Sequence, residues 1–472
     1  MKHVAFDGRL VMLGFGSIGQ GVLPLLLRHI DIAPERITIV TAEARGEDVA
    51  AEYSIRFILE AATRENYAEL LSPLLGKGDF LLNLSVDVSS VALMKLCNRL
   101  DALYLDTVVE PWAGGYTDPA LTPSQRSNYA MREEAMALRA PFKRGPTSVT
   151  SHGANPGLVS HFVKQALLDI ARDTGTPVAT PPPAANRAAW AGIAERLGVK
   201  VIHSAERDTQ VADRPKQPGE FVNTWSVDGF VGEACQPAEL GFGTHEKALP
   251  DDGHRHGFGC DAAIYLMRPG ASTRVRSWTP LEGPMHGFLI THNEAISLAD
   301  YYSVRDASGA VRYRPTAHYA YHPCDDAVLS VHEFAGKNWQ LQPEKRLMTD
   351  EITSGMDELG VLLMGHAKGA YWYGSRLTIE EARRVVPHNN ATSLQVTAAV
   401  LAGVIWAIEN PRRGVVEADE LDHARILAIC APYLGDVVGV YSDWTPLLDR
   451  EQLFPEVVDT TDPWQFSNFR VT

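Results

Sequence analysis

A glycine-rich turn near the N-terminus, LGFGSIGQG at 13–21, constrains the fold more than any other stretch of this sequence. Gly14, Gly16 and Gly19 fit the G-x-G-x-x-G fingerprint and stand between a run typical of a strand and a run typical of a helix. There the first glycine permits a tight turn, the second lets the backbone approach a pyrophosphate, and the third lets helix and strand pack closely. The sequence therefore predicts a dinucleotide on the helix N-terminus; a glycine-rich turn without a nucleotide is the alternative.

The second predicted strand indicates which dinucleotide fits. The fingerprint expects an acidic residue about 20 positions on, to hold the ribose hydroxyls. The strand RITIV ends at Val40, Thr41 follows, and Glu43 is the nearest acid, whereas Arg45 would suit a 2′-phosphate. The acid comes slightly late, yet the pattern favours NAD over NADP.

Apolar runs separated by amphipathic stretches fill the first 150 residues, the pattern of βαβ units. The runs are RLVMLGF (9–15), RITIV (36–40), DFLLNLS (79–85) and ALYLDTV (102–108). A helix is predicted over 127–140 and a further strand over 147–153. The predicted fold class is therefore α/β, with a doubly wound parallel sheet.

The chain changes character after a proline-rich segment. Four prolines in 177–183 cannot continue the preceding helix, so a break is predicted near 174–185. From about 186 to 385, short aromatic-rich strands such as AHYAYH predict a mixed sheet with helices. The end of the chain returns to helices. The most apolar of them, LQVTAAVLAGVIWAIEN, is too short and too mixed to span a bilayer and is predicted to be buried.

Composition narrows the class of partner. A chain of 472 residues predicts two or three domains. A net charge of -15 disfavours nucleic acid and anionic membranes and is compatible with cationic substrates. Five cysteines without a CxxC argue against a disulfide framework or zinc ribbon and favour a reducing, cytoplasmic location. The N-terminus runs straight into a predicted strand, so it is not read as a signal peptide.

The stretch TWSVDGFVGEACQPAEL at 224–240 places Trp225 near Asp228, Glu233 and Glu239, with no Lys or Arg among them. A solvated loop over a packed tryptophan would explain this. The alternative is that the cation is a ligand, because Trp is the best aromatic partner for a cation, at about 2 kcal/mol when desolvated. Buried carboxylates also need partners, which a diamine supplies.

Other candidate site residues are polar side chains beside predicted strand ends, where doubly wound sheets bind ligands. They are Asp106, Thr107, Glu110, Asn155 and Glu206. Each could instead be an N-cap or a solvated loop acid. His292 could equally be a helix cap or a core histidine, and Asp357 a charge on a helix surface. His245, His254 and His256 do not match a standard zinc spacing, so a flexible loop and no metal are expected there.

Five motifs together resemble the bacterial homospermidine synthases. They are GFGSIG, NLSVD, YLDTVVEPW, HGANPG and NTWSVDGF followed by GE, and the resemblance covers essentially the whole chain. It places the chain in the wider saccharopine dehydrogenase-like and carboxynorspermidine dehydrogenase-like group. That group implies a Rossmann domain with a second α/β domain inserted. The implied division is an NAD-binding domain (1–155), a substrate and dimerisation domain (156–385) and C-terminal helices returning to the Rossmann domain (386–472), in a homodimer.

The resemblance also implies the chemistry. Bound NAD takes a hydride from an amine-bearing carbon of putrescine, and the imine loses ammonia by hydrolysis or transimination. A second putrescine attacks, and the same NADH reduces the new imine to homospermidine. Spermidine can also serve as the aminobutyl donor. Oxidation needs a neutral amine, whereas a free alkylamine has a pKa near ~10.4, so a carboxylate or histidine must accept a proton, and the sequence does not indicate which one.

Residue roles follow by resemblance. Trp225 would hold the cationic amine or iminium and Glu233 an ammonium; Glu206, Glu110 and Asp357 would anchor the other charged ends, with Asn155 and His292 completing the site. The NAD-binding residues would be Gly14, Gly16, Ser17, Ile18, Gly19, Thr41, Glu43, Asn83, Ser85, Asp106, Thr107 and Pro156. Two alternatives stay open: a reductive amination dehydrogenase that consumes NAD(P)H, and an NAD-binding sensor without catalysis. The first needs an Arg or Lys for a substrate carboxylate, and NTWSVDGFVGE has none.

Overall fold

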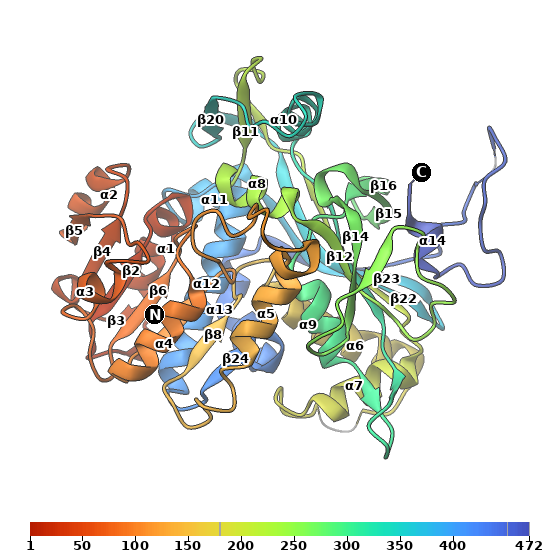
Figure 1. Ribbon diagram of the computed structural model, residues 1–472, viewed down its shortest axis with the longest axis horizontal. Coiled ribbons are helices and arrows are strands. Elements are labelled where there is room, and N and C mark those ends of the chain that lie inside the picture. The colour runs from red at the N-terminus through yellow and green to blue at the C-terminus, as the bar shows by residue number, and fades with distance from the viewer. Residues whose placement is uncertain (179–180, 451, 472) are drawn as a thin grey trace.

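The computed structural model describes residues 1–178, 181–450 and 452–471 and contains two large β-sheets with helices packed around them (Figure 1). Residues 179–180 of the predicted break lie outside the described residues. The helix before the break, α6 (Leu158–Thr174), ends where the sequence predicts, and Gly175 caps it at φ 70. Glycine is suited to this left-handed conformation because it has no Cβ.

The first sheet has seven strands, and every neighbouring pair is parallel. In order they are β24 (Val415–Glu417), β8 (Ser148–Thr150), β7 (Leu103–Asp106), β6 (Phe80–Asn83), β2 (Leu10–Leu13), β4 (Ile37–Thr41) and β5 (Arg56–Leu59). The strands predicted in the first 150 residues are all among them. The sequence prediction of a parallel sheet is therefore confirmed.

Helices cover both faces of this sheet because alternate strand residues point in opposite directions. Leu10 and Met12 pack with α1 (Ser17–His29) and α12 (Ala391–Glu409). Val11 and Leu13 pack on the other face with α4 (Ser90–Leu100) and α5 (Asn128–Met136). By length and composition α12 could cross a membrane, but 89% of its apolar window is buried inside the protein, as expected of a core helix.

The second sheet is mixed: β9 and β19 are parallel, and the other neighbours are antiparallel. Its main path is β13 (Gly253–Arg255), β14 (Ala263–Pro269), β12 (Pro237–Gly241), β19 (Thr316–His322), β9 (Val201–Asp208), β22 (Met356–His366), β23 (Gly369–Thr378) and β25 (Asp436–Ser442), with the hairpin β15 (Arg274–Thr279) and β16 (Gly283–Phe288) joined through β19. The predicted mixed sheet in the middle of the chain is confirmed.

Shorter elements complete the fold. The remaining α-helices are α2 (Glu47–Glu52), α3 (Tyr67–Leu71), α7 (Arg187–Leu197), α8 (Val227–Cys235), α9 (Asn293–Tyr301), α10 (Asp325–Gly336), α11 (Ile379–Val385), α13 (His423–Cys430) and α14 (Phe466–Phe469). Two-stranded ribbons pair β1 (Val4–Ala5) with β3 (Ile30–Asp31), β10 (Val211–Ala212) with β21 (Ile352–Ser354), β11 (Glu220–Asn223) with β20 (Glu344–Leu347), and β17 (Val304–Arg305) with β18 (Val311–Tyr313).

The C-terminal part of the chain contributes to both sheets. Besides the helices α12 and α13, it supplies β24 at the edge of the first sheet and β25 at the edge of the second. Beyond β25, Trp444, Trp464 and Phe469 pack on Leu362 and Trp372 of the second sheet. The chain thus crosses between the two sheets more than once, which fixes them together.

Candidate active site

The predicted cofactor residues gather at the carboxyl ends of adjacent parallel strands. Thr41, Asn83 and Asp106 are the last residues of β4, β6 and β7. Leu13, the last residue of β2, is the register partner of Asn83, and Asn83 is the partner of Asp106. These ends therefore lie at one edge of the sheet, beside the glycine turn, where doubly wound sheets bind ligands.

The glycine turn fits a pyrophosphate. Gly16 is the N-cap of α1, no side chain caps this end, and the first turn of the helix contains no acidic residue. A Cβ on Gly16 would meet nothing within 4 Å, whereas a Cβ on Gly14 (φ +87) would come within 2.7 Å of the Leu84 backbone, and one on Gly19 within 2.9 Å of Phe15. Gly14 and Gly19 thus serve close packing, and Gly16 leaves open space before backbone N–H groups that favour an anion.

The other cofactor candidates differ in their surroundings. Asn83 accepts hydrogen bonds from the Ser85 backbone N–H (3.2 Å) and hydroxyl (2.6 Å). Asp106 accepts from the Tyr104 hydroxyl (2.7 Å) and the Ser151 N–H (2.7 Å), so it ties β7 to the turn after β8. Burial raises the pKa of Asp106 to about 7 although these bonds lower it. The remaining candidates Ser17, Ile18 and Thr107 are partly exposed, Glu43 is exposed, and Pro156 follows a cis peptide bond.

One face of the second sheet gathers several carboxylates. Glu206 and Asp208 are two residues apart on β9, so their side chains point to the same face. Across the neighbouring strands, Asp357 of β22 is the register partner of Asp208, and Tyr321 of β19 is the register partner of Glu206. Glu206 was predicted to follow a strand, but it lies inside one, because pairing on both sides keeps β9 extended as far as Asp208. Asp357, which could have been a helix-surface charge, lies in a strand and is 0% exposed.

Glu206 joins the two sheets. Its Oε2 accepts hydrogen bonds from Asn155 Nδ2 (2.6 Å) and from the Tyr319 hydroxyl (2.5 Å). Asn155 belongs to the turn that follows β8 of the first sheet, as predicted, so this turn reaches the carboxylate face of the second sheet. Burial raises the pKa of Glu206 to about 7, against these two hydrogen bonds, which lower it. The carboxyl therefore changes its protonation near neutral pH.

Asp357 is the most unusual group of this face. Neither carboxyl oxygen has a hydrogen-bond partner among the described residues. Burial and the nearby carboxylates Glu206 and Asp208 raise the pKa of Asp357 well above its usual value. An unpartnered buried carboxylate is costly, and a cationic ligand would remove that cost.

The stretch around Trp225 is a helix rather than the predicted loop. Ser226 caps α8 by accepting a hydrogen bond from the Gly229 N–H (3.1 Å). Val227, Phe230 and Ala234 are buried at the spacing of three to four residues that places side chains on one face of a helix. Trp225 immediately precedes this cap. Its Nε1 donates to the Tyr321 hydroxyl (3.0 Å), and its ring lies 5.4 Å from that of Phe230. The indole is thus held at the carboxylate face.

The three acids of that stretch have separate environments. Asp228 pairs with Lys345 on the surface. Glu239 accepts from the Thr291 hydroxyl (2.6 Å) and lies 3.2 Å from His256. Only Glu233 turns toward the carboxylate face, and there His292 lies 2.8 Å from it. The expectation of several uncompensated acids in this stretch is therefore wrong, because each of the three has a partner elsewhere in the chain.

His292 is an ion-paired residue rather than a helix cap. It occupies the N-cap position of α9 without making a side-chain cap bond. Its Nε2 lies 2.8 Å from Glu233 and its Nδ1 3.3 Å from Glu294. Burial lowers the pKa of His292, but the two glutamates outweigh burial and raise it well above its usual value. The imidazolium also lies beside Tyr319, with ring centroids 4.4 Å apart and the ring planes tilted by 36°.

Glu110 lies close to this pair. Burial raises its pKa to about 8, opposed by hydrogen bonds from Tyr116 and from the Asp87 N–H (3.4 Å) and reinforced by the charge of Glu233. Thus all seven catalytic candidates are placed at or near one face.

The sequence interpretation missed four residues of this face: Asp208, Glu294, Tyr319 and Tyr321. Three of them could have been found, because every second residue of SAERD and AHYAYH points to the same face of its strand.

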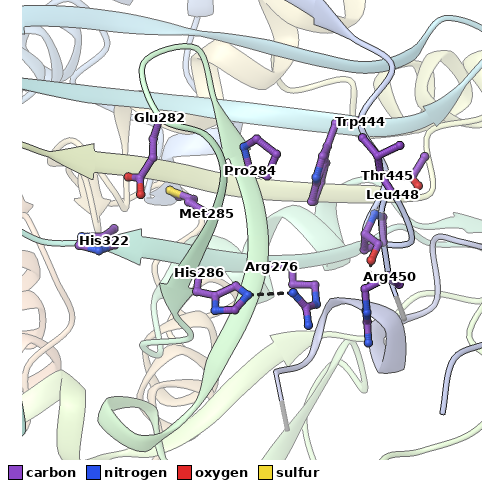
Figure 2. Close-up of a pocket in the computed structure, with 11 residues that line it drawn as sticks. Arg276, Glu282, Pro284, Met285, His286, His322, Trp444, Thr445, Leu448 and Arg450 are labelled. Atoms are coloured by element: carbon purple, nitrogen blue, oxygen red, sulfur yellow. Dashed lines mark hydrogen bonds between the residues drawn. The ribbon is translucent and has the colours of Figure 1, made fainter. Parts of the chain in front are cut away.

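Other polar regions lie apart from this face. His254 belongs to β13, so 243–257 contains a paired strand rather than a flexible loop alone, and His245 contacts the Trp464 carbonyl (3.0 Å). No metal-binding group of three or more His, Cys, Asp or Glu is found in the described part of the chain. A hollow of about 410 Å³ lies between the β15–β16 hairpin and the segment after β25, where Arg276 faces His286 at 2.8 Å (Figure 2).

Comparisons with known proteins match the whole chain. Residues 10–149 match the saccharopine dehydrogenase NADP binding domain and residues 153–440 the saccharopine dehydrogenase C-terminal domain. The homospermidine synthase of Blastochloris viridis is 56% identical over 98% of each chain, and that of Mesorhizobium japonicum is 52% identical over 98% of this chain and 96% of the relative.

The chain belongs to the homospermidine synthase family. A crystal structure of the homospermidine synthase from Legionella pneumophila in complex with NAD is 50% identical and superposes with a TM-score of 0.93, covering 100% of this chain and 99% of that one. Saccharopine dehydrogenase from Saccharomyces cerevisiae shares the fold at 11% identity and a TM-score of 0.52. The α/β architecture of a Rossmann-like domain with a second, mixed-sheet domain is therefore that of this family.

Proposed function

We propose that this chain converts two putrescine molecules into homospermidine and ammonia with NAD as a recycled cofactor, and that spermidine can replace putrescine as the aminobutyl donor. The observation that carries the proposal is the carboxylate face. Glu206, Asp208, Asp357 and Glu233 converge there beside Trp225, and in the described residues no Lys or Arg pairs with their side chains. A substrate with ammonium groups supplies the missing charge. The family membership points to the same substrate class.

The residues would divide the work as follows. Gly14, Gly16, Gly19, Thr41 and the strand ends that follow would hold NAD, which supplies oxidation of the amine and reduction of the imine. Asp357, Glu110 and Glu233 would bind the ammonium ends, and the indole face of Trp225 would hold the cation beside them. These assignments extend the roles that the resemblance implied.

Proton movement belongs to the chain's own groups. Glu206, with a pKa raised to about 7, can accept a proton from an ammonium group near neutral pH, while Asn155 and Tyr319 keep its carboxyl oriented. His292 would stay protonated between Glu233 and Glu294 and limit the negative charge of the site. Water is excluded where these groups are buried, which strengthens each ionic contact.

The organisation of the protein is part of the proposal. We assign NAD binding to 1–155 and the substrate site and dimer contacts to 156–385. The expected return of 386–472 to the Rossmann domain needs correction: α12 and β24 join that domain, whereas β25 and the segment after it belong to the second sheet. The proposal includes a homodimer, which rests on the resemblance to the family alone, and a cytoplasmic location, which the five free cysteines and the absence of disulfides among the described residues support.

Mass spectrometry of a reaction with putrescine and a small amount of NAD tests the function. We expect homospermidine and ammonia at many equivalents per NAD, without net NADH. Formation of only one equivalent would contradict cofactor recycling. A dehydrogenase of the reductive amination type would instead consume NADH in proportion to product, and a sensor would bind NAD without turnover of any diamine.

A further inference from the structure

Asp357 faces a second buried carboxylate, Asp208, directly across a strand pair. The two residues are register partners between β22 and β9, and both are 0% exposed. Opposite residues of an antiparallel pair have Cβ atoms about 5 Å apart on the same face. Two carboxylates at that separation in a dry site do not both ionise without a large cost, so one of them holds a proton.

The surroundings decide which carboxyl is charged. Oδ1 of Asp208 accepts from the Gln210 N–H (2.8 Å) and Nε2 (3.1 Å), and Oδ2 accepts from the Thr224 hydroxyl (2.7 Å) and the Thr392 hydroxyl (3.5 Å). No described residue lies within full hydrogen-bonding geometry of Asp357, and the one hydroxyl that favours its ionised form is that of Thr392, which it shares with Asp208. Because donors stabilise the ionised form, the negative charge belongs on Asp208 and the proton on Asp357. The pKa of Asp357 is raised well above its usual value by burial and by the neighbouring carboxylates.

The other groups around Asp357 reinforce this state. Glu206 on β9 and Glu358 on the same strand add negative charge, and Tyr321 on β19 and Thr392 on α12 are neutral. The two cations beside this group are engaged by other acids: His292 by Glu233 and Glu294, and Arg207, which favours the ionised form of Asp208, by Glu282. Within 1–178, 181–450 and 452–471, no positive partner is therefore left over to ionise Asp357 in the absence of a ligand.

We propose that Asp208 is a positioning residue that keeps the Asp357 carboxyl protonated until a diamine enters, so that the incoming ammonium group displaces that proton. The O–H bond of Asp357 breaks, the proton leaves to water, and the ammonium group becomes the counter-charge of the new carboxylate; no electrons are transferred. This inference rests on the proposed function and assigns a task to a residue that need not touch the substrate.

The test is the pH dependence of kcat/KM for putrescine with the NAD-loaded full chain, measured as homospermidine formed. In the wild type, kcat/KM falls at low pH because Asp357 must lose its proton to bind the cation and Glu206 must be free to accept one. Asp208→Asn removes the like charge, and the Thr224 and Thr392 hydroxyls can donate to or accept from the new amide. The midpoint of the acidic limb is expected to move down by about one to two pH units.

A matched control lies one residue along the strand. Glu358 is equally buried, points to the opposite face of β22, and pairs with Arg376 at 2.7 Å. Glu358→Gln is expected to move the midpoint much less than Asp208→Asn, because Glu358 is the weakest of the acids that raise the pKa of Asp357 and its charge is already compensated by Arg376. An unmoved midpoint in Asp208→Asn, or an equal movement in both variants, overturns the proposal. Absence of homospermidine from the wild type would overturn the proposed function instead.

A second measurement needs no variant and covers the case in which Asp208→Asn does not fold. Wild-type enzyme loaded with NAD is mixed rapidly with putrescine in weakly buffered solution containing a pH indicator dye. About one proton per site is expected to appear before the first turnover at a pH below the acidic limb. Binding without proton release would show that Asp357 is already ionised and would reject the inference.

Discussion

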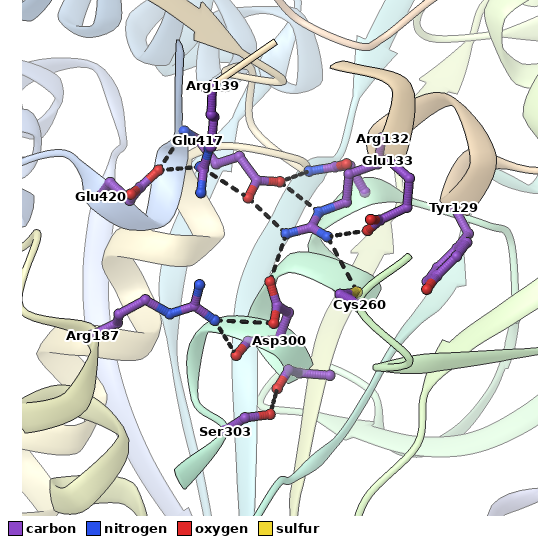
Figure 3. A network of polar contacts seen from close by, with 12 residues as sticks. Tyr129, Arg132, Glu133, Arg139, Arg187, Cys260, Asp300, Ser303, Glu417 and Glu420 are labelled. Carbon is purple, nitrogen blue, oxygen red and sulfur yellow. Dashed lines mark hydrogen bonds and ion pairs between the residues drawn. The ribbon is translucent and has the colours of Figure 1, made fainter. Parts of the chain in front are cut away.

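Two groups of buried carboxylates in this protein have opposite electrostatic environments. In the arginine cluster, Arg132 lies 2.7 Å from Glu417 and 3.1 Å from Asp300, and Arg139 and Arg187 also bind these acids (Figure 3). On the carboxylate face, no arginine or lysine side chain of the described residues pairs with Glu206 or Asp357. Burial by itself favours a raised pKa in all four acids, and the pKa values of Glu206 and Asp357 are raised. The arginines outweigh burial at Glu417 and Asp300 and hold the pKa of each below its usual value.

The difference separates a structural task from a binding task. The arginine cluster joins α5, β24 and α9, so it ties the first sheet to a helix packed on the second. A completed ion network holds its elements together and needs no ligand. An incomplete one leaves the protein with buried acids whose charge must come from outside, which is what a diamine provides.

The largest effect is expected from removing the central arginine. Arg132→Met leaves Glu417 and Asp300 buried without their main counter-charge, so the free energy of unfolding should fall by about 3–5 kcal/mol. Chemical denaturation followed by circular dichroism measures it. The matched control is Arg172→Met, because Arg172 pairs with Asp169 at 3.0 Å with a side chain 68% exposed; its expected loss is below about 1 kcal/mol. Equal losses would erase the distinction between the clusters.

The second-largest expected effect is that the stability of the carboxylate face and that of the arginine cluster depend on pH in opposite directions. Glu206 and Glu110 have pKa values of about 7 and about 8 in the folded protein, against about 4.3 in an unfolded chain. The folded state therefore binds more protons between these values, and the ligand-free protein should lose about 4 kcal/mol as the pH rises from 6 to 9. Added putrescine should reduce that loss. The arginine cluster behaves oppositely: with its carboxyl pKa values lowered, its contribution is lost only as the pH falls below about 4.

Trp225 tests whether the carboxylate face binds a cation through an aromatic ring. Trp225→Ala should lower kcat/KM for putrescine by about thirtyfold, equivalent to about 2 kcal/mol, and Trp225→Phe should retain part of the activity. Because Trp225 also packs against Phe230, some loss of melting temperature is expected in the alanine variant. Rates are therefore compared far below the melting temperature. Full activity of Trp225→Ala there would remove the cation-binding role.

The smallest effect contrasts one carboxyl from each group. Asp357→Asn should leave the unfolding free energy of the ligand-free protein unchanged or raise it by about 1 kcal/mol or more, because it removes a carboxyl that must take up a proton when it is buried, while putrescine turnover falls. Glu417→Gln should instead destabilise the protein, because Arg132 then lacks its bidentate partner. Denaturation at pH 8 compares both. A destabilised Asp357→Asn would mean that Asp357 has a structural partner after all.

Local sequence determined the nucleotide-binding half of the protein. The glycine fingerprint, the strand that precedes it and the helix that follows are contiguous, and Thr41, Asn83 and Asp106 come at strand ends that apolar runs mark directly. A parallel sheet then brings these ends to one edge without further information. The α8 helix also had a local signal, because Ser226 is a good N-cap, but its glycines and acids suggested a loop.

The tertiary structure alone decided the charge of the buried acids. Nothing near Asp228 in the sequence indicates Lys345 as its partner, and nothing near Glu417 indicates Arg132. Asp208 and Asp357 become neighbours only through the pairing of β9 with β22. Sequence determined which residues could ionise, but burial and long-range partners set their pKa, since the energy of a buried charge depends on the few groups within several ångströms of it.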